Sequence, residues 1–156
     1  MKKILILFIA MASTLLVTAC GNKGKEILKT CTLEVDNSTN GYKIESTYEI
    51  YGRGKIVEKV ISNEIVTSDN VEMLDNLENN LSETYKTIND TYGGYTFDIT
   101  KESGKLTFNT EADYTIMDFD KYINDNKDIK DYLDSNNKLL IAGLEKMYES
   151  LGATCN

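Results

Sequence analysis

The sequence predicts an α+β domain: an antiparallel sheet of about five strands, in the order β-β-β-α-β-β-α, with two helices packed on one face. Alternating apolar and polar residues, typical of strands, fill residues 30–67 and 95–116. Apolar residues spaced three and four apart, typical of helices, fill residues 69–89 and 135–151. Short turn sequences between the strands favour hairpins, and hairpins imply antiparallel pairing.

The first three strands are predicted over residues 30–35, 42–51 and 55–67. They are separated by the turn-forming sequences DNSTNG and GRG. The first two alternate clearly between apolar and polar residues. The third is rich in β-branched residues but its alternation is blurred, so its register stays open.

The first helix, at residues 69–89, carries one apolar stripe, and its other positions are polar or charged apart from Met73. Ser68 or Asp69 is a suitable N-cap, with Glu72 placed as in a capping box. The stripe consists of Val71, Leu74, Leu77, Leu81, Tyr85 and Ile88.

The remaining chain predicts a hairpin, an irregular segment and a last helix. The hairpin pairs residues 95–99 with 105–116 around Ser103-Gly104. Residues 117–137 are acidic and irregular, with local helical character around Tyr122 and Tyr132. A helix over residues 135–151 ends at Gly152. The apolar faces are predicted to hold Leu106, Phe108, Ala112, Tyr114 and Ile116 in the second hairpin strand, and Leu139, Leu140, Gly143, Leu144, Met147, Tyr148 and Leu151 in the last helix.

The amino end has the organisation of a bacterial export signal. Two lysines follow Met1, an uncharged apolar run covers residues 4–17, and the small residues Thr18 and Ala19 close it. The run is shorter than the roughly 20 residues that a membrane-spanning helix needs.

Val17-Thr18-Ala19-Cys20 resembles a bacterial lipobox. The resemblance implies that a diacylglyceryl group is attached to Cys20 and that cleavage leaves Cys20 as the first residue. Because two acyl chains give stable anchoring, the chain is expected at the cell membrane, facing outwards, on what the composition suggests is a Gram-positive cell surface. We therefore expect a signal peptide at residues 1–19, a lipidated cysteine and tether at 20–28, and one domain at 29–156.

Cysteine usage fits this location. Once Cys20 carries lipid, Cys31 and Cys155 remain, one near each end of the folded part. A disulfide between them would persist outside the cytoplasm. Two independent thiols are the alternative.

The charge balance indicates the class of partner. Of 17 basic and 25 acidic residues, the leader removes two basic ones, so the mature chain carries a net charge of −10. Such a domain repels nucleic acid, and binding through charge would favour a cationic protein or peptide.

No catalytic set or cofactor site emerges. The chain has no histidine, so it lacks the usual general base near neutral pH and the commonest nitrogen ligand of zinc. Residues 118–134 are rich in Asp and Asn, but they do not match the calcium-binding loop of an EF-hand. A looser metal site using Asp118, Asp120 and Asp125 is a weak alternative to a solvated acidic loop.

Three of the ten tyrosines are candidates for a binding surface. Tyr51, Tyr92 and Tyr132 fit the core pattern least well because they lie in or beside predicted turns and loops.

From about Cys31 to the end, the chain resembles the YehR-like family of small bacterial lipoproteins. The resemblance rests on the lipobox, on YKIESTYEIYGRGKIVEKV, and on YKTINDTYGGYTFDITKESGKLTFNTEADYTIMDFDKY, followed by the last helix. It implies the fold and the location. The family's function is uncharacterised, so no catalytic or ligand residues follow from it, and neither does the disulfide.

These observations favour a membrane-anchored, non-catalytic binding or envelope-associated domain. A small hydrolase or metal-dependent accessory enzyme using carboxylates is the first alternative. A structural spacer in the envelope is the second.

Overall fold

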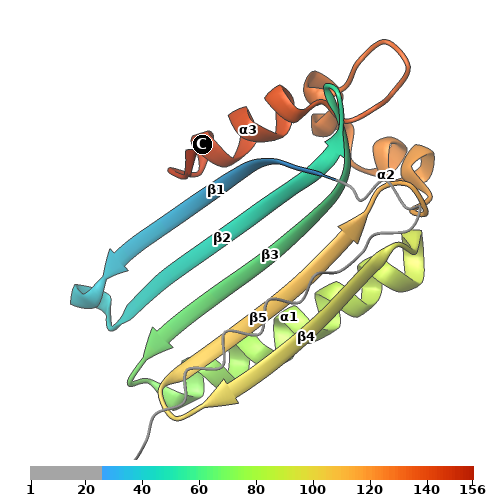
Figure 1. The fold of residues 1–156 in the computed structure, drawn as a ribbon. Coiled ribbons are helices and arrows are strands. Elements are labelled where there is room, and N and C mark those ends of the chain that lie inside the picture. The colour runs from blue at the N-terminus through green and yellow to red at the C-terminus, as the bar shows by residue number, and fades with distance from the viewer. Residues whose placement is uncertain (1–25) are drawn as a thin grey trace, which may run out of the picture.

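A computed structural model describes residues 26–156, which form one antiparallel sheet with helices on one side (Figure 1). The sheet has six strands in the order β4-β5-β3-β2-β1-β6. The strands are β1 (Glu26–Asn37), β2 (Tyr42–Arg53), β3 (Ile56–Ser68), β4 (Tyr95–Glu102), β5 (Lys105–Asp113) and β6 (Thr154–Cys155). The helices are α1 (Val71–Tyr92), α2 (Phe119–Asp125) and α3 (Ile141–Ser150), with short 3₁₀ turns η1 (Ser38–Asn40) and η2 (Lys127–Tyr132). The predicted α+β class is confirmed.

One face of the sheet packs against the helices and holds two separate apolar clusters. Under α1, Leu74 meets Val66, Leu106 and Phe108, all buried. Under α3, Leu144 and Tyr148 lie over Cys31, Ile50 and Val60. Side chains alternate between the two faces along each strand, so pairing in register places every second residue of β1, β2, β3 and β5 in this covered layer.

A β-bulge changes the alternation near the start of β3, and the apolar Ile61 and Ile65 on the opposite face blur it further along. Tyr51 pairs with Lys59 but Gly52 pairs with Val57, so β3 has one extra residue at this point. Val57 and Val60 therefore both face the core although an odd number of positions separates them. A Cβ on Gly52 would lie 2.0 Å from the Ile56 carbonyl oxygen, so this position requires glycine.

The last helix begins later than predicted. Leu139 and Leu140 are apolar at helical spacing, but they form isolated bridges with Leu133 and Ile56, and α3 begins at Ile141. These pairings hold the chain extended before the helix. The end at Gly152 is confirmed, because Gly152 N donates to Glu149 O and φ is 95°.

Several smaller expectations differ from the structure. Val71 and Leu151, expected on the apolar stripes of the two helices, are 60% and 62% exposed. Asn70, rather than Ser68 or Asp69, caps α1 by accepting a hydrogen bond from Met73 N. Ile116 lies beyond the end of β5 and is 72% exposed. The expected tether at residues 20–28 overlaps β1, which already begins at Glu26. The sixth strand, only two residues long, was not predicted.

The predicted disulfide joins Cys31 to Cys155, with the Cα atoms 4.0 Å apart. The two cysteines are register partners in neighbouring antiparallel strands, β1 and β6. Thr30 and Asn156 exchange backbone hydrogen bonds beside them. The bond therefore holds the carboxyl end of the chain against β1.

Replacing both Cys31 and Cys155 by Ala removes this crosslink without leaving an odd thiol. The closed loop has a sequence separation of 124 residues. The chain-entropy model then predicts a free energy of unfolding lower by about 4–5 kcal/mol. Urea unfolding followed by circular dichroism measures the change. An unfolding midpoint equal to that of the oxidised wild type would contradict the prediction.

Candidate functional site

The candidate functional site is the face of the sheet opposite the helices. Both long helices lie on the other side, α1 behind β4 and β5 in Figure 1. We call the exposed side the open face. Its centre carries the neutral side chains Ile61, Asn63 and Ile65 of β3, and Asn63 Nδ2 donates to Asn109 Oδ1 at 2.7 Å.

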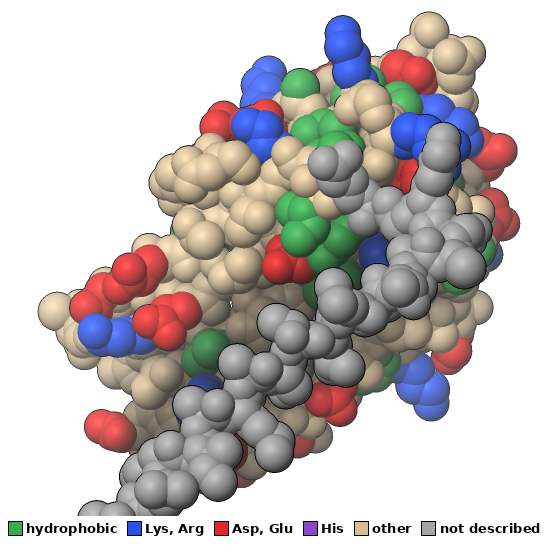
Figure 2. Space-filling view, viewed as in Figure 1, with side chains coloured by type: hydrophobic (Ala, Val, Ile, Leu, Met, Phe, Trp, Pro, Cys, Tyr) green, Lys and Arg blue, Asp and Glu red, His purple; other side chains and the backbone are tan. Residues whose placement is uncertain are grey.

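Acidic side chains outnumber basic ones on the open face. Figure 2 shows this face from the same side as Figure 1, with acidic side chains gathered over the end of the β1–β2 hairpin. By strand register, the acidic residues of the open face are Glu34, Asp36, Glu45, Glu49, Asp98, Glu102, Glu111 and Asp113, and the basic ones are Lys43, Arg53, Lys59 and Lys105. The surface therefore favours cations.

Two of these lysines are held by neighbouring carboxylates. Lys43 Nζ lies 3.0 Å from Asp36 Oδ2, and Lys59 Nζ lies 3.4 Å from Glu111 Oε2. Hydrogen bonds from the Ser38 side chain, from Lys43 and from the Ser38 backbone lower the pKa of Asp36 to about 2. Asp36 therefore organises the hairpin and is already occupied by these contacts.

Glu34 and Glu45 stand directly opposite each other in the β1–β2 ladder, and both are exposed. Like charges in this position disfavour the pairing. Lys43 lies close enough to interact with both carboxylates. Asp36 is the main cause of its raised pKa, and Glu34 and Glu45 raise the pKa further. One lysine cannot neutralise three carboxylates, so this end of the open face keeps a negative potential.

Two shallow depressions in the open face each have a pair of acidic residues in their lining. The first, of about 320 Å³, is lined by Thr32, Leu33, Glu34, Glu45, Ser46, Thr47, Asn63 and Ile65. The second, of about 300 Å³, is lined by Ile61, Thr96, Phe97, Asp98, Asn109, Thr110 and Glu111. The arrangement suits a ligand that presents positive charge at more than one point.

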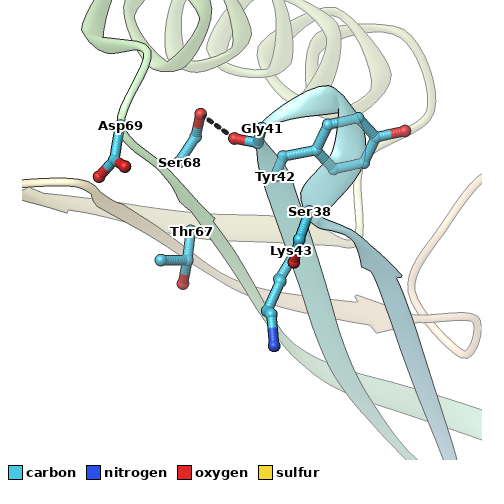
Figure 3. A pocket seen from close by; sticks show the side chains of 7 residues that line it. All are labelled: Ser38, Gly41, Tyr42, Lys43, Thr67, Ser68 and Asp69. Carbon is cyan, nitrogen blue, oxygen red and sulfur yellow. Dashed lines mark hydrogen bonds between the residues drawn. The ribbon is translucent and has the colours of Figure 1, made fainter.

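A third depression, shown in Figure 3, is lined by a residue that makes structural hydrogen bonds. It has a volume of about 200 Å³ and lies where the β1–β2 hairpin meets the end of β3. Ser68 Oγ donates to Gly41 O at 2.6 Å and accepts from Asn70 N at 3.1 Å. The Ser68 hydroxyl in this depression therefore connects the β1–β2 hairpin to the start of α1.

The three candidate tyrosines are not brought together. Tyr51 lies on the open face, where its hydroxyl donates to Glu49 at 2.6 Å and Lys59 Nζ lies 5.3 Å from its ring centroid. Tyr92 ends α1 and donates to Asp125 at 3.1 Å. Tyr132 contacts Gly143 and lines a depression of about 430 Å³ beside α2. Only Tyr51 belongs to the candidate surface.

The three aspartates considered as metal ligands in the acidic segment 118–134 make different contacts. Asp118 caps α2 by accepting from Lys121 N at 3.1 Å, Asp120 lies in the first turn of α2, and Asp125 accepts from Tyr92. Within residues 26–156, no group of three acidic or cysteine side chains is arranged to hold a metal ion. Cys20 lies outside the described residues.

The fold can be compared with solved structures. No protein-family model and no curated protein matches the sequence. The NMR structure of E. coli YehR superposes with a TM-score of 0.54 over 85% of this chain and 92% of that protein, at 19% identity. The chain has the fold of YehR. An NMR structure of a Streptococcus pneumoniae protein covers 99% of both chains at a TM-score of 0.48 and 15% identity.

The likeness to YehR confirms the expected resemblance at the level of the fold. At 19% identity it carries no site residues to this chain. No helix among the described residues has the length and apolar character to cross a membrane.

The Asp36 carboxyl should titrate near pH 2, below its ordinary value of 3.8, in carbon-detected NMR. Its contacts stabilise the hairpin fully above about pH 4 and are lost as the pH falls through 2. Ser38→Ala removes the largest cause and should raise this pKa, whereas Thr39→Ala, on the same turn, should not. An equal pKa in both variants would contradict the assigned cause.

Proposed function

We propose that the protein is a lipid-anchored, non-catalytic binding domain on the outer face of the cell membrane. Its open face binds a cationic protein or peptide segment. The observation that carries this proposal is the excess of carboxylates on a sheet face that no described helix covers.

Two features, one near each end of the chain, support anchoring outside the cytoplasm: the lipobox-like sequence at Cys20 and the disulfide that includes Cys155. The sequence before Cys20 resembles a lipobox, and β1 begins six residues after Cys20. A domain so close to two acyl chains stays at the membrane surface. The Cys31–Cys155 disulfide suits an oxidising compartment outside the cytoplasm.

Binding of a cationic segment is supported by the placement of charge. The acidic pair Glu34 and Glu45 lies at one depression, and Asp98 with Glu111 lies at the other. An extended chain with lysine or arginine side chains would supply the counter-charges that the face lacks. Electrostatic attraction would also accelerate encounter with such a partner.

Cys20→Ser tests the anchor. In a bacterial host fed an alkyne-tagged fatty acid, the wild-type chain should take up label and sediment with membranes, and Cys20→Ser should do neither. Cys155→Ser, which leaves the lipobox intact, is the matched control and should keep its label. Unlabelled wild-type protein in the cytosol, with Met1 retained, would contradict the proposal.

Charge removal tests the binding surface. The probe is a fluorescent lysine–arginine decapeptide, and the protein is the mature chain from Cys20 in a maltoside detergent. Glu34→Gln, Glu45→Gln and Asp98→Asn combined should weaken binding at least about tenfold, because three counter-charges are lost. Binding to the wild type should also weaken with added salt.

The matched control changes net charge equally on α1, using the exposed acids Glu72, Glu83 and Asp90. This control should bind nearly as well as the wild type. Equal losses in the two triple variants would show that net charge, rather than the open face, attracts the peptide. Altered envelope integrity on gene deletion, with no binding to the peptide, would favour the spacer role instead.

A further inference from the structure

The helix-covered face also contains a polar strip, and it lies between the two apolar clusters. Glu64 of β3 is its centre, and its register partners are Ser46 of β2 and Phe108 of β5. The next row across the sheet holds Tyr48, Ser62 and Thr110. Charged and hydroxyl side chains thus separate the cluster around Leu74 of α1 from the cluster around Leu144 of α3.

Glu64 contacts a phenol group rather than a cation. Tyr48 OH donates to Glu64 Oε2 at 3.4 Å. The Glu64 charge also contributes to raising the pKa values of Tyr48, Tyr85, Tyr95 and Tyr148, in each case after burial, the largest cause. These tyrosines come from β2, α1, β4 and α3, and among them the Tyr48 hydroxyl donates directly to Glu64. No ion pair in residues 26–156 includes Glu64.

The Ser46 hydroxyl beside Glu64 lacks a hydrogen-bond partner. Ser46 is 4% exposed, and its Oγ has no hydrogen-bond partner of good geometry, although it lies near enough to Tyr48 to lower that hydroxyl's pKa. A buried hydroxyl without a partner costs free energy. A half-buried carboxylate without a counter-ion costs more.

Two groups of packed aromatic rings lie on the same helix-covered face. Tyr48 stacks on Tyr148 with ring centroids 4.2 Å apart, and Tyr85 lies 5.4 Å from Tyr95 and 5.5 Å from Phe97. Ring faces attract cations, and a carboxylate among them adds a full negative charge. An anion would be repelled by Glu64, and an apolar group would leave the carboxylate and hydroxyl unpaired.

We propose that the strip formed by Glu64, Ser46 and the surrounding tyrosines binds a compact ammonium group, either the primary amine of a lysine-like ligand or a quaternary headgroup. Glu64 supplies the counter-charge, Ser46 Oγ accepts a hydrogen bond from a primary amine, and the tyrosine rings contact the rest of the cation. This site lies on the face opposite the open face and does not depend on it.

Tyrosine-ring NMR of the mature chain from Cys20, in a maltoside detergent that carries no ammonium group, tests the proposal. Choline, tetramethylammonium or methylammonium should cause saturable shifts in Tyr48, Tyr85, Tyr95 and Tyr148. Methylammonium represents the primary amine, and choline and tetramethylammonium represent the quaternary headgroup. Comparing their affinities shows which kind of ligand the site prefers. The neutral isostere of choline, 3,3-dimethylbutan-1-ol, should cause none.

Glu64→Gln should weaken ammonium binding at least about tenfold, because it keeps the shape and removes the charge. Glu83→Gln on the exposed side of α1 is the matched control and should not change the affinity. Ser46→Ala is a second variant and should weaken methylammonium but not tetramethylammonium, which cannot donate a hydrogen bond. Equal affinity of wild type and Glu64→Gln, no saturable shift, or equal shifts with the neutral isostere would overturn the proposal.

The unliganded protein provides an independent test through stability. Burial raises the pKa of Glu64 above its ordinary value of 4.5, and hydrogen bonds from Tyr48 and Ser62 offset only part of that rise. The folded state therefore binds the proton more tightly, and stability is lost as the pH rises through the raised pKa. The groups facing Glu64, namely Ser46, Tyr48, Ser62, Tyr85, Tyr95 and Tyr148, stay neutral over this range.

Glu64→Gln should consequently raise the melting temperature at pH 7 and leave it unchanged at pH 3, where both forms are neutral. Thermal unfolding at the two pH values measures this. A Glu64→Gln variant less stable than the wild type at pH 7 would mean that Glu64 is already well compensated, and the site would have no unmet charge to offer.

Discussion

The constraint on which the structure depends is the register of the long antiparallel strands. A slip of one residue between β1, β2 and β3 would exchange their two faces, moving Cys31, Ile50 and Val66 out of the core and acidic residues into it. The bulge at Gly52 and the hydrogen bond from Ser68 to Gly41 fix the two ends of this arrangement. The division into a helix-covered face and an acidic open face follows from that register.

The disulfide contributes at the level of the whole chain. It joins β6 to β1. The last residues of the chain are therefore held against the first strand that follows the proposed lipid anchor at Cys20. A crosslink at this position shortens the unfolded chain far more than a local one would. A small domain with two separate apolar clusters, rather than one continuous core, gains from such a restraint.

Much of the fold could be predicted because the signals were local. Periodicity identified α1, and hairpin turns identified the strand pairs. The start of α3 could not be predicted, since Leu139 and Leu140 pair with Leu133 and Ile56, and only tertiary structure shows this. The candidate sites were harder still. The sequence shows many acids, but only the register shows that Glu34 opposes Glu45 or that Glu64 faces the core. A single Glu in phase with Val60, Ser62 and Val66 was the available signal, and the apolar Ile61 and Ile65 on the opposite face obscured it.

The central claim is that the open face, and not the helical side, recognises a cationic segment. Backbone-amide NMR of the mature protein, titrated with the lysine–arginine peptide, tests this claim most directly. In the Glu64→Gln variant, which lacks the charge of the proposed ammonium site, the account predicts shifts concentrated at Thr32, Thr47, Asn63 and Asn109, with α1 and α3 unchanged. Shifts concentrated along α1 and α3, with β1, β2 and β3 silent, would contradict it.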